Sequence, residues 1–312
     1  MYRILAVAVG PDNGGVHIAT PNPANVRPYI YGLIDGLLLG YQQKIGSHYD
    51  IWYRECPPDT KNAFTSGDGA ENDLIFPMSA RVLKQAITSG IPQPIVSPTA
   101  SNFQRDVAPK IPPNVTGINA QRDQGNLLID YFSQAWPSLQ TLYYLHFAGY
   151  GPSEAAQTGL LKEAKGLGIR CNSLTMNKDG DLNGQLNKLA QAAQDGHTGL
   201  LVLPIDFCLG EASTQAPHII QVANQYDFPS FFPIPDWATS ATMPAFGGYG
   251  ISQLNCGKLA SDLIYPILWN SAPPGGTIVT APPSLFDLVV NQTAADDLGI
   301  RLSRRIQRQV RP

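Results

Sequence analysis

Charged residues, cysteine motifs and long apolar runs are all scarce in this sequence of 312 residues. Only 14% of the residues are charged and 43% are hydrophobic, which is typical of a folded chain and excludes a disordered one. The net charge of −3 draws neither nucleic acid nor an anionic membrane to the whole chain. The exception is the basic tail at 301–312, RLSRRIQRQVRP, which we interpret as a solvated terminal helix or, alternatively, a membrane or partner patch.

No apolar run approaches the roughly 20 residues that a transmembrane helix requires. The longest runs, 31–41 and 197–207, are short and are interrupted by Gly, Asp or Pro. The first residues, MYRILAVAVGPDN, do not follow the order of regions in a signal peptide. The sequence therefore leaves two alternatives, a cytoplasmic protein or a mature form with a starting Met.

Metal-binding and catalytic motifs are missing as well. Cys56, Cys171, Cys208 and Cys256 show no CxxC spacing, so we expect buried thiols or, in an oxidising compartment, one disulfide. The sequence contains no GxxxxGK[ST] loop, no HExxH and no GxSxG, and its five histidines are scattered. We therefore predict no enzyme, no metal and no cofactor. A carboxylate pair formed by two of the aspartates named below is the remaining catalytic alternative.

What the sequence does contain is a repeated alternation of strands and helices. Residues 1–118 read β-α-β-β-α-β, and after the break PPNVTGINAQRDQGN the alternation restarts and continues to about residue 235. This pattern predicts an α/β fold of two Rossmann-like lobes, each a parallel sheet flanked by helices. The elements after residue 246 have no domain of their own, so we expect them to return to the two lobes through a hinge of several crossings.

We place the first lobe at 1–118 plus about 246–283 and the second at 119–245 plus about 284–312. In open α/β sheets, ligands bind beyond the carboxyl ends of the strands. Two lobes that face each other would bring both sets of loops to one cleft.

Five stretches resemble the solute-binding proteins of ABC transporters with the type I periplasmic binding fold, and within them the tryptophan/tyrosine-binding branch. The stretches are NVTGI, TLYYLHFAGYGPSEAAQTGLLKEAKGLGI, LLVLPIDF, YGISQ and FDLVVNQTAADDLGIRLS. The last follows the closing segment of the family nearly residue for residue, which implies a final crossing to the second lobe. The long loop PDNGGVHIATPNPANVRP and the stretch PPDTKNAFTSGDGAEND depart from the family.

Residues at the strand ends are the candidate ligand contacts. They are Met78, Ser79, Thr99, Ala100, Ser101, Tyr150, Ser153, Asp206, Phe207, Asp236, Trp237 and Tyr249. Helix starts after PMSA and GYG can hold a carboxylate, an aspartate can hold an ammonium group, and the aromatic rings can form an apolar wall. The structural alternatives are a plain N-cap at Ser79, a turn at 99–101, surface cover by Tyr150, a hinge plug at Trp237, and packing of Tyr249 inside the first lobe.

The resemblance implies a receptor that binds a small carboxylate-bearing solute in the cleft, with an aromatic or branched apolar amino acid as the expected ligand. It also implies closure of the lobes, docking to an ABC permease, and a periplasmic or lipid-anchored extracellular location. We expect a monomer that binds no nucleic acid. The alternative is a free-standing ligand sensor or regulator domain of the same fold.

Overall fold

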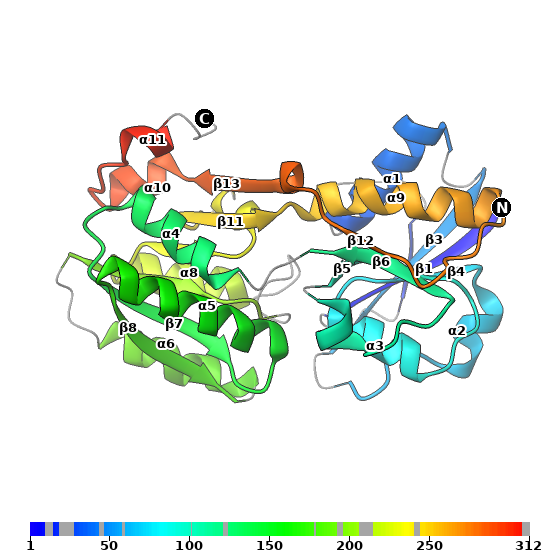
Figure 1. Cartoon of the computed structure of the whole chain (residues 1–312), viewed down its shortest axis with the longest axis horizontal. Helices are drawn as coiled ribbons and strands as arrows, with labels where there is room; N and C mark the ends of the chain where they lie inside the picture. The colour runs from blue at the N-terminus through cyan, green and yellow to red at the C-terminus, as the bar shows by residue number, and fades with distance from the viewer. Residues whose placement is uncertain are drawn as a thin grey trace. The chain divides into compact units, whose positions relative to one another are not determined.

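The computed structural model describes residues 1–9, 15–18, 28–43, 47–57, 60–100, 102–120, 124–177, 179–191, 196–205, 215–239 and 244–307. The chain forms two compact α/β units, each built on its own sheet (Figure 1). The first consists mainly of Met1–Gln121 and Gln253–Leu285. The second consists mainly of Arg122–Leu209, Ser213–Ser252 and Phe286–Pro312. The predicted fold class, parallel sheets flanked by helices, is confirmed.

The first sheet has the strand order β12-β6-β5-β4-β1-β3-β2, and only its edge strand β2 is antiparallel. β1 and β4 are apolar on both faces, as strands covered by helices on either side require. The strands are β1 (Tyr2–Val9), β2 (Val16–Ile18), β3 (Tyr49–Cys56), β4 (Leu74–Pro77), β5 (Ile95–Ala100), β6 (Val115–Asn119) and β12 (Ile278–Thr280). β2 belongs to the long loop that departs from the family, and it adds a strand beside β3.

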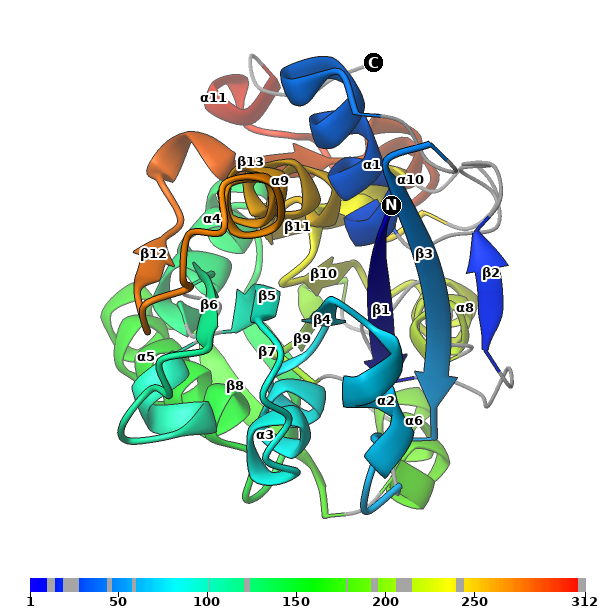
Figure 2. The ribbon, with the colours of Figure 1, turned by 90° about the vertical axis from the view of Figure 1, so that its right-hand side faces the viewer.

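Helices cover both faces of this sheet. α1 and α9 lie side by side on one face, and α2 and α3 lie on the other (Figure 2). These elements are α1 (Pro28–Tyr41), α2 (Ser66–Glu71), α3 (Ala80–Thr88), α9 (Gln253–Trp269), the π-helix η1 (Phe103–Val107) and the 3-10 turn η4 (Pro283–Leu285). Tyr29, Leu33 and Leu37 form an apolar stripe on α1, and all three are buried.

Small residues set the distance between α1 and α9. A Cβ atom at Gly32 would overlap the backbone of Leu254, and one at Gly257 would overlap the backbone of Tyr29. One turn along each helix, a Cβ atom at Gly36 would overlap the side chain of Ser261. At the rim of this contact the Lys258 ammonium lies 2.7 Å from the Asp35 carboxylate. The backbones of the two helices therefore approach closely at Gly32 and Gly257.

The second sheet has the order β13-β11-β10-β9-β7-β8, and only β13 is antiparallel. Its strands are β7 (Thr141–Phe147), β8 (Arg170–Met176), β9 (Thr198–Val202), β10 (Ser230–Phe232), β11 (Gly247–Ile251) and β13 (Phe286–Val290). Its helices and turns are α4 (Gly125–Ala135), α5 (Gly151–Leu167), η2 (Asp179–Asp181), α6 (Leu182–Ala190), α8 (Gln215–Gln225), η3 (Pro235–Thr239), α10 (Gln292–Asp297) and α11 (Arg304–Gln307).

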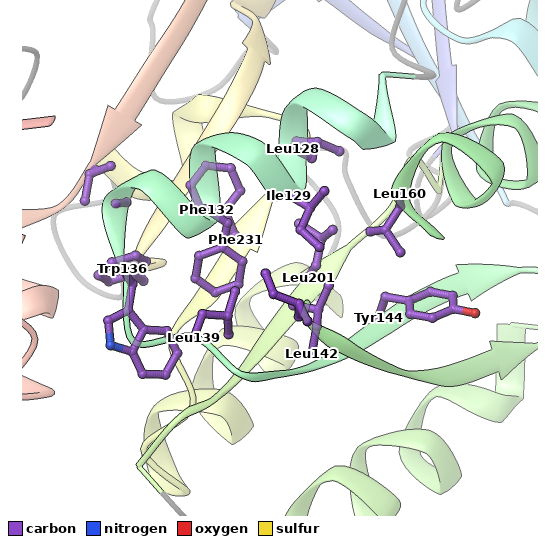
Figure 3. Packing of buried hydrophobic residues seen from close by; sticks show 14 of the residues in the cluster. Leu128, Ile129, Phe132, Trp136, Leu139, Leu142, Tyr144, Leu160, Leu201 and Phe231 are labelled. Carbon is purple, nitrogen blue, oxygen red and sulfur yellow. The ribbon is translucent and has the colours of Figure 1, made fainter. Parts of the chain in front are cut away.

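The core of the second unit lies between the sheet and the pair α4 and α5. Phe132 of α4 stacks on Phe231 of β10 with ring centroids 5.1 Å apart, and Leu160 of α5 joins the same cluster (Figure 3). Ile306 in α11 is only 1% exposed and packs into this cluster as well. The first turn of the basic tail is therefore anchored to the unit, and its last residues, 308–312, lie outside the described part of the chain.

The placement of β11 differs from the sequence analysis, which puts the chain from about residue 246 in the first lobe. β11 instead pairs with β10 and β13 in the second sheet. Its glycines make this possible, because a Cβ atom at Gly247 would lie 2.7 Å from the ring of Phe231, and one at Gly250 would overlap the carbonyl of Pro233. These glycines serve close backbone approach, and the chain passes to the first unit after Ser252.

Candidate functional site

The first sheet changes direction between β1 and β4. The chain leaves β1 for β3 on one side, and after β4 it continues to β5 on the other side. At such a switch point the two outgoing loops diverge and leave a crevice at the carboxyl ends of the strands. The loop after β1 starts at residues 10–14, which lie outside the described part. The loop after β4 is Met78–Ser79.

Ser79 caps helix α3 at this switch point. Its Oγ accepts a hydrogen bond from the Val82 N–H at 3.2 Å, and its carbonyl accepts from Leu83 N–H at 2.9 Å. The Met78 N–H donates to the Val7 carbonyl at 2.8 Å and so continues the pairing of β4 with β1. The N-cap interpretation is confirmed. A capped helix start also presents the positive end of the helix dipole, where an anion is stabilised.

Thr99 and Ala100 end the next strand, β5, and both are buried. The pairing of β5 with β6 shifts register between Ser97 and Ala100, a bulge of the kind that re-aims residues near ligand sites. Ser97 Oγ donates to the carbonyls of Pro77 and Thr99, at 3.1 Å each, and so ties the bulge to the end of β4. Ser101 lies outside the described residues.

Two asparagines at the same edge were missed by the sequence analysis. Asn102 is the second residue after β5, and its side-chain oxygen accepts from the Arg105 N–H at 3.0 Å, which caps the π-helix η1. Asn119 is the last residue of β6 and is half-buried. Single-turn π segments are frequent at functional sites. The signal available in the sequence was an Asn at or within two residues of each strand end.

A second missed feature holds the segment after β3. Arg54 donates from Nη2 to Asp68 Oδ2 at 2.7 Å and to the Ala63 carbonyl at 2.6 Å, and from Nη1 to Asp68 Oδ1 at 3.1 Å. Asp68 Oδ2 also accepts from the Thr65 N–H at 2.6 Å. Gln85 of α3 bonds both Thr60 and Ala63. This network fixes the stretch that departs from the family, beside the carboxyl end of β3.

The second sheet changes direction between β7 and β9. The chain leaves β7 through α5 to β8, and then returns to β9 on the other side. The loop after β7 is Ala148–Tyr150, and the loop after β9 begins at Leu203. Asp206 and Phe207 lie in that second loop, outside the described residues. Their predicted roles remain predictions.

Tyr150 is the N-cap residue of α5, is half-buried and stands at this switch point. Ser153 is fully buried, and its Oγ accepts from the Phe147 N–H at 3.0 Å. Glu154 Oε1 accepts from the Gly149 N–H at 2.8 Å, and Gly149 adopts φ +76°. The side chains of Ser153 and Glu154 thus hold the β7–α5 turn, Ala148–Tyr150, through the backbone N–H groups of Phe147 and Gly149.

Asp236 and Trp237 follow β10 in the turn η3. Thr239 Oγ1 donates to the Asp236 carbonyl at 2.9 Å, and the Ala245 N–H donates to the Trp237 carbonyl at 3.0 Å. Asn291 Nδ2 donates to the Ala238 carbonyl at 2.9 Å, so the closing segment of the chain fixes this turn. The buried Trp237 indole N–H has no hydrogen-bond partner within the described ranges.

Tyr249 lies apart from these residues. It is the central residue of β11 and packs on Tyr131 of α4 at 4.5 Å and on Phe286 of β13 at 5.9 Å. Burial, followed by the neighbouring Tyr131, raises the pKa of its hydroxyl. It therefore packs in the second unit, and not inside the first lobe as the structural alternative held.

The described part of the chain contains no group of three or more His, Cys, Asp or Glu side chains placed to hold a metal ion. Cys56, Cys171 and Cys256 form no disulfide with one another, and Cys208 lies outside the described residues. No helix within the described ranges is both long and apolar enough to span a membrane.

Two units with diverging loops at the carboxyl ends of their sheets define a class of bilobed binding proteins. The chain matches the family "ABC transporter substrate binding protein" over residues 28–311 and belongs to it. Proteins of this family are the substrate-binding components of ABC transporters, and they act outside the cytoplasm with a small-molecule ligand and a membrane permease. No curated protein sequence matches the chain significantly.

Three solved structures share the fold. A conserved domain protein from Vibrio cholerae O1 biovar El Tor has a TM-score of 0.72 and 18% identity, covering 99% of this chain and 98% of that one. An ABC domain from Streptococcus pneumoniae in complex with L-Trp has a TM-score of 0.67 and 14% identity over 99% and 98%. A ligand-free, open substrate-binding protein with adhesive properties from Clostridium difficile has a TM-score of 0.61 and 19% identity over 97% of each chain.

Proposed function

We propose that the protein binds a small carboxylate-bearing solute, an amino acid with an aromatic or branched apolar side chain, for an ABC importer. The observation that carries the proposal is the capped start of α3 at the β1/β4 switch point, where Ser79 and the helix dipole favour a carboxylate. Thr99 stands at the neighbouring strand end. In the second unit Tyr150 and Trp237 supply aromatic surface, and Asp206 or Asp236 supplies the charge for an ammonium group.

The L-Trp complex from Streptococcus pneumoniae supports the same ligand class, as a property of that protein. The partner we propose is the membrane permease of the importer. We propose that the protein docks to it as a monomer, and that it is located in the periplasm or anchored to lipid outside the cell. A free-standing sensor of the same fold would lack such a partner. Permease and ATPase genes beside the gene for this protein would separate the two functions.

A thermal-shift screen over amino acids, aromatic acids and sugars tests the ligand class. A solute at a hundredfold excess over its Kd stabilises the folded state by about 2.7 kcal/mol, so we expect a rise in Tm of about 5 °C or more for an aromatic or branched amino acid. A response to sugars alone would contradict the carboxylate assignment.

Two substitutions in the second unit locate the ammonium group once an amino acid binds. We expect either Asp206→Asn or Asp236→Asn to weaken binding by about 30-fold or more, because a buried ligand charge loses its partner. Asp227→Asn is the control: it sits in the turn after α8, and we expect Kd within about twofold of the wild type. Unchanged Kd in both test variants would exclude a bound ammonium at these acids.

A further inference from the structure

His146 is a buried imidazole beneath the β7–α5 turn. It is the sixth residue of β7, and its side chain is 6% exposed. Leu142, Tyr144 and His146 alternate along the strand, and the first two belong to the core cluster under α4 and α5. His146 therefore lies on the α5 side of the sheet, directly before the residues that form the turn.

Among the described residues, only one of the two ring nitrogens of His146 has a hydrogen-bond partner. Nε2 lies 2.9 Å from Ser173 Oγ and 2.8 Å from Thr175 Oγ1 on the adjacent strand β8, and the two hydroxyls are 2.6 Å apart. Nδ1 is buried and has no hydrogen-bond partner in the described part of the chain. A buried N–H without an acceptor is costly, so the neutral ring is favoured with its proton on Nε2 and the lone pair on Nδ1.

A second proton would have to go to Nδ1, and the groups around the ring decide what happens then. β8 contributes two uncharged hydroxyls, β7 contributes Tyr144 at a ring distance of 5.6 Å, and α5 contributes the carboxylate of Glu154. Burial lowers the pKa of His146, and Glu154 opposes that effect. Glu154 is thus the anion that would attract an imidazolium here.

That same carboxylate holds the turn. Glu154 Oε1 accepts from the Gly149 N–H, and Ser153 Oγ accepts from the Phe147 N–H at the start of the turn. The turn ends in Tyr150, one of the residues of the proposed solute site. A charge on His146 and the N–H of Gly149 therefore compete for one carboxylate.

We propose that His146 is a positioning residue that makes the solute site of the second unit acid-sensitive. When the imidazole gains a proton, it draws Glu154 from the Gly149 N–H, and the β7–α5 turn that carries Tyr150 loosens. Near pH 7 the ring is neutral and the turn is held. The inference concerns regulation of the proposed solute site, so it rests on that proposed function.

Hydrogen–deuterium exchange of the turn in the ligand-free protein tests the inference without a known solute. Between about pH 7.5 and about pH 5, after correction for the intrinsic rate, we expect the peptide that contains Gly149 and Tyr150 to exchange about tenfold faster in the wild type. In His146→Gln, which cannot be protonated but keeps an amide donor toward Ser173 and Thr175, we expect no such acceleration.

Two further variants keep the result interpretable. Glu154→Gln retains an acceptor for Gly149 but removes the charge, so its acid response should also be largely lost, even if His146→Gln does not fold. His218→Gln is the control, because His218 on α8 contacts only Asn183 among the bonds described for its ring, at 3.0 Å, and we expect it to respond as the wild type does. Equal acceleration in the wild type, His146→Gln and Glu154→Gln, or none in the wild type, overturns the inference.

The same samples separate this inference from the proposed function. If the turn responds to acid but no amino acid in the screen binds, the proposed ligand class fails and the switch stands. If an amino acid binds equally well at both pH values and the turn does not respond, the switch fails and the function stands.

Discussion

Replacing Gly32 with alanine is expected to destabilise the first unit by about 3 kcal/mol, because the new methyl group must push α1 away from α9. The methyl meets the backbone of Leu254 and not a flexible side chain, so no rotamer change relieves the overlap. Gly257→Ala meets the backbone of Tyr29 across the same contact and should have a similar effect. The measurement is the midpoint of urea unfolding, followed by a signal from the first unit.

Gly40→Ala is the matched control on the same helix. A Cβ atom at Gly40 has no neighbour within 4 Å, so only helix propensity changes, and we expect stability to be unchanged or raised by up to about 1 kcal/mol. The double variant Gly32→Ala, Gly257→Ala should cost less than the sum of the single changes, because one separation of the helices relieves both overlaps. Equal midpoints for Gly32→Ala and Gly40→Ala would contradict the packing of α1 on α9.

Replacing Arg54 with methionine is expected to cost about 3–5 kcal/mol, because it leaves the carboxylate of Asp68 buried without its cation. Only 8% of the surface of Asp68 is exposed. Arg54 also donates to the Ala63 carbonyl, which would lose this hydrogen bond in the variant. Unfolding by urea, with a first-unit signal, measures the loss. Arg54→Met combined with Asp68→Asn should recover part of it, since no unpaired charge then remains.

The exposed pair Lys258–Asp35 provides the comparison. Its side chains are 43% and 22% exposed, so water screens the interaction, and Lys258→Met should change stability by less than about 1 kcal/mol. If both arginine and lysine substitutions had the same small effect, Arg54 would not be the support of the segment after β3.

Strand–helix alternation could be predicted from the sequence because buried parallel strands and amphipathic helices carry strong local patterns, as in 1–118. Switch-point residues such as Ser79 and Tyr150 followed from the same patterns, since both stand directly at a strand end before a helix. What the sequence did not show are contacts between distant segments. The Arg54 network joins residues that are up to 31 positions apart, from Arg54 to Gln85, and no local pattern marks them.

Glycine was the most ambiguous residue in the sequence. Gly32 and Gly36 stand among the apolar residues of α1, so nothing in the local sequence marks the close α1–α9 contact that they set. The glycines of β11 fit either close backbone approach or rotation at a hinge, and pairing with β10 decides for close approach. His146 stands in an apolar strand, and only the packed structure shows that its Nδ1 has no hydrogen-bond partner among the described residues.

The position of β13 also determines when the protein can fold during its synthesis. β13 completes the edge of the second sheet beside β11, and α9 covers a face of the first sheet, so neither unit has all its parts until about residue 290 has left the ribosome. At roughly 5–20 residues per second, the β11 edge waits about 2–8 s for β13, and the α1 face waits more than about 10 s for α9. Both units must therefore complete their folding at almost the same time, late in translation. Until then the apolar faces of the incomplete sheets must be protected from aggregation by other contacts of the nascent chain.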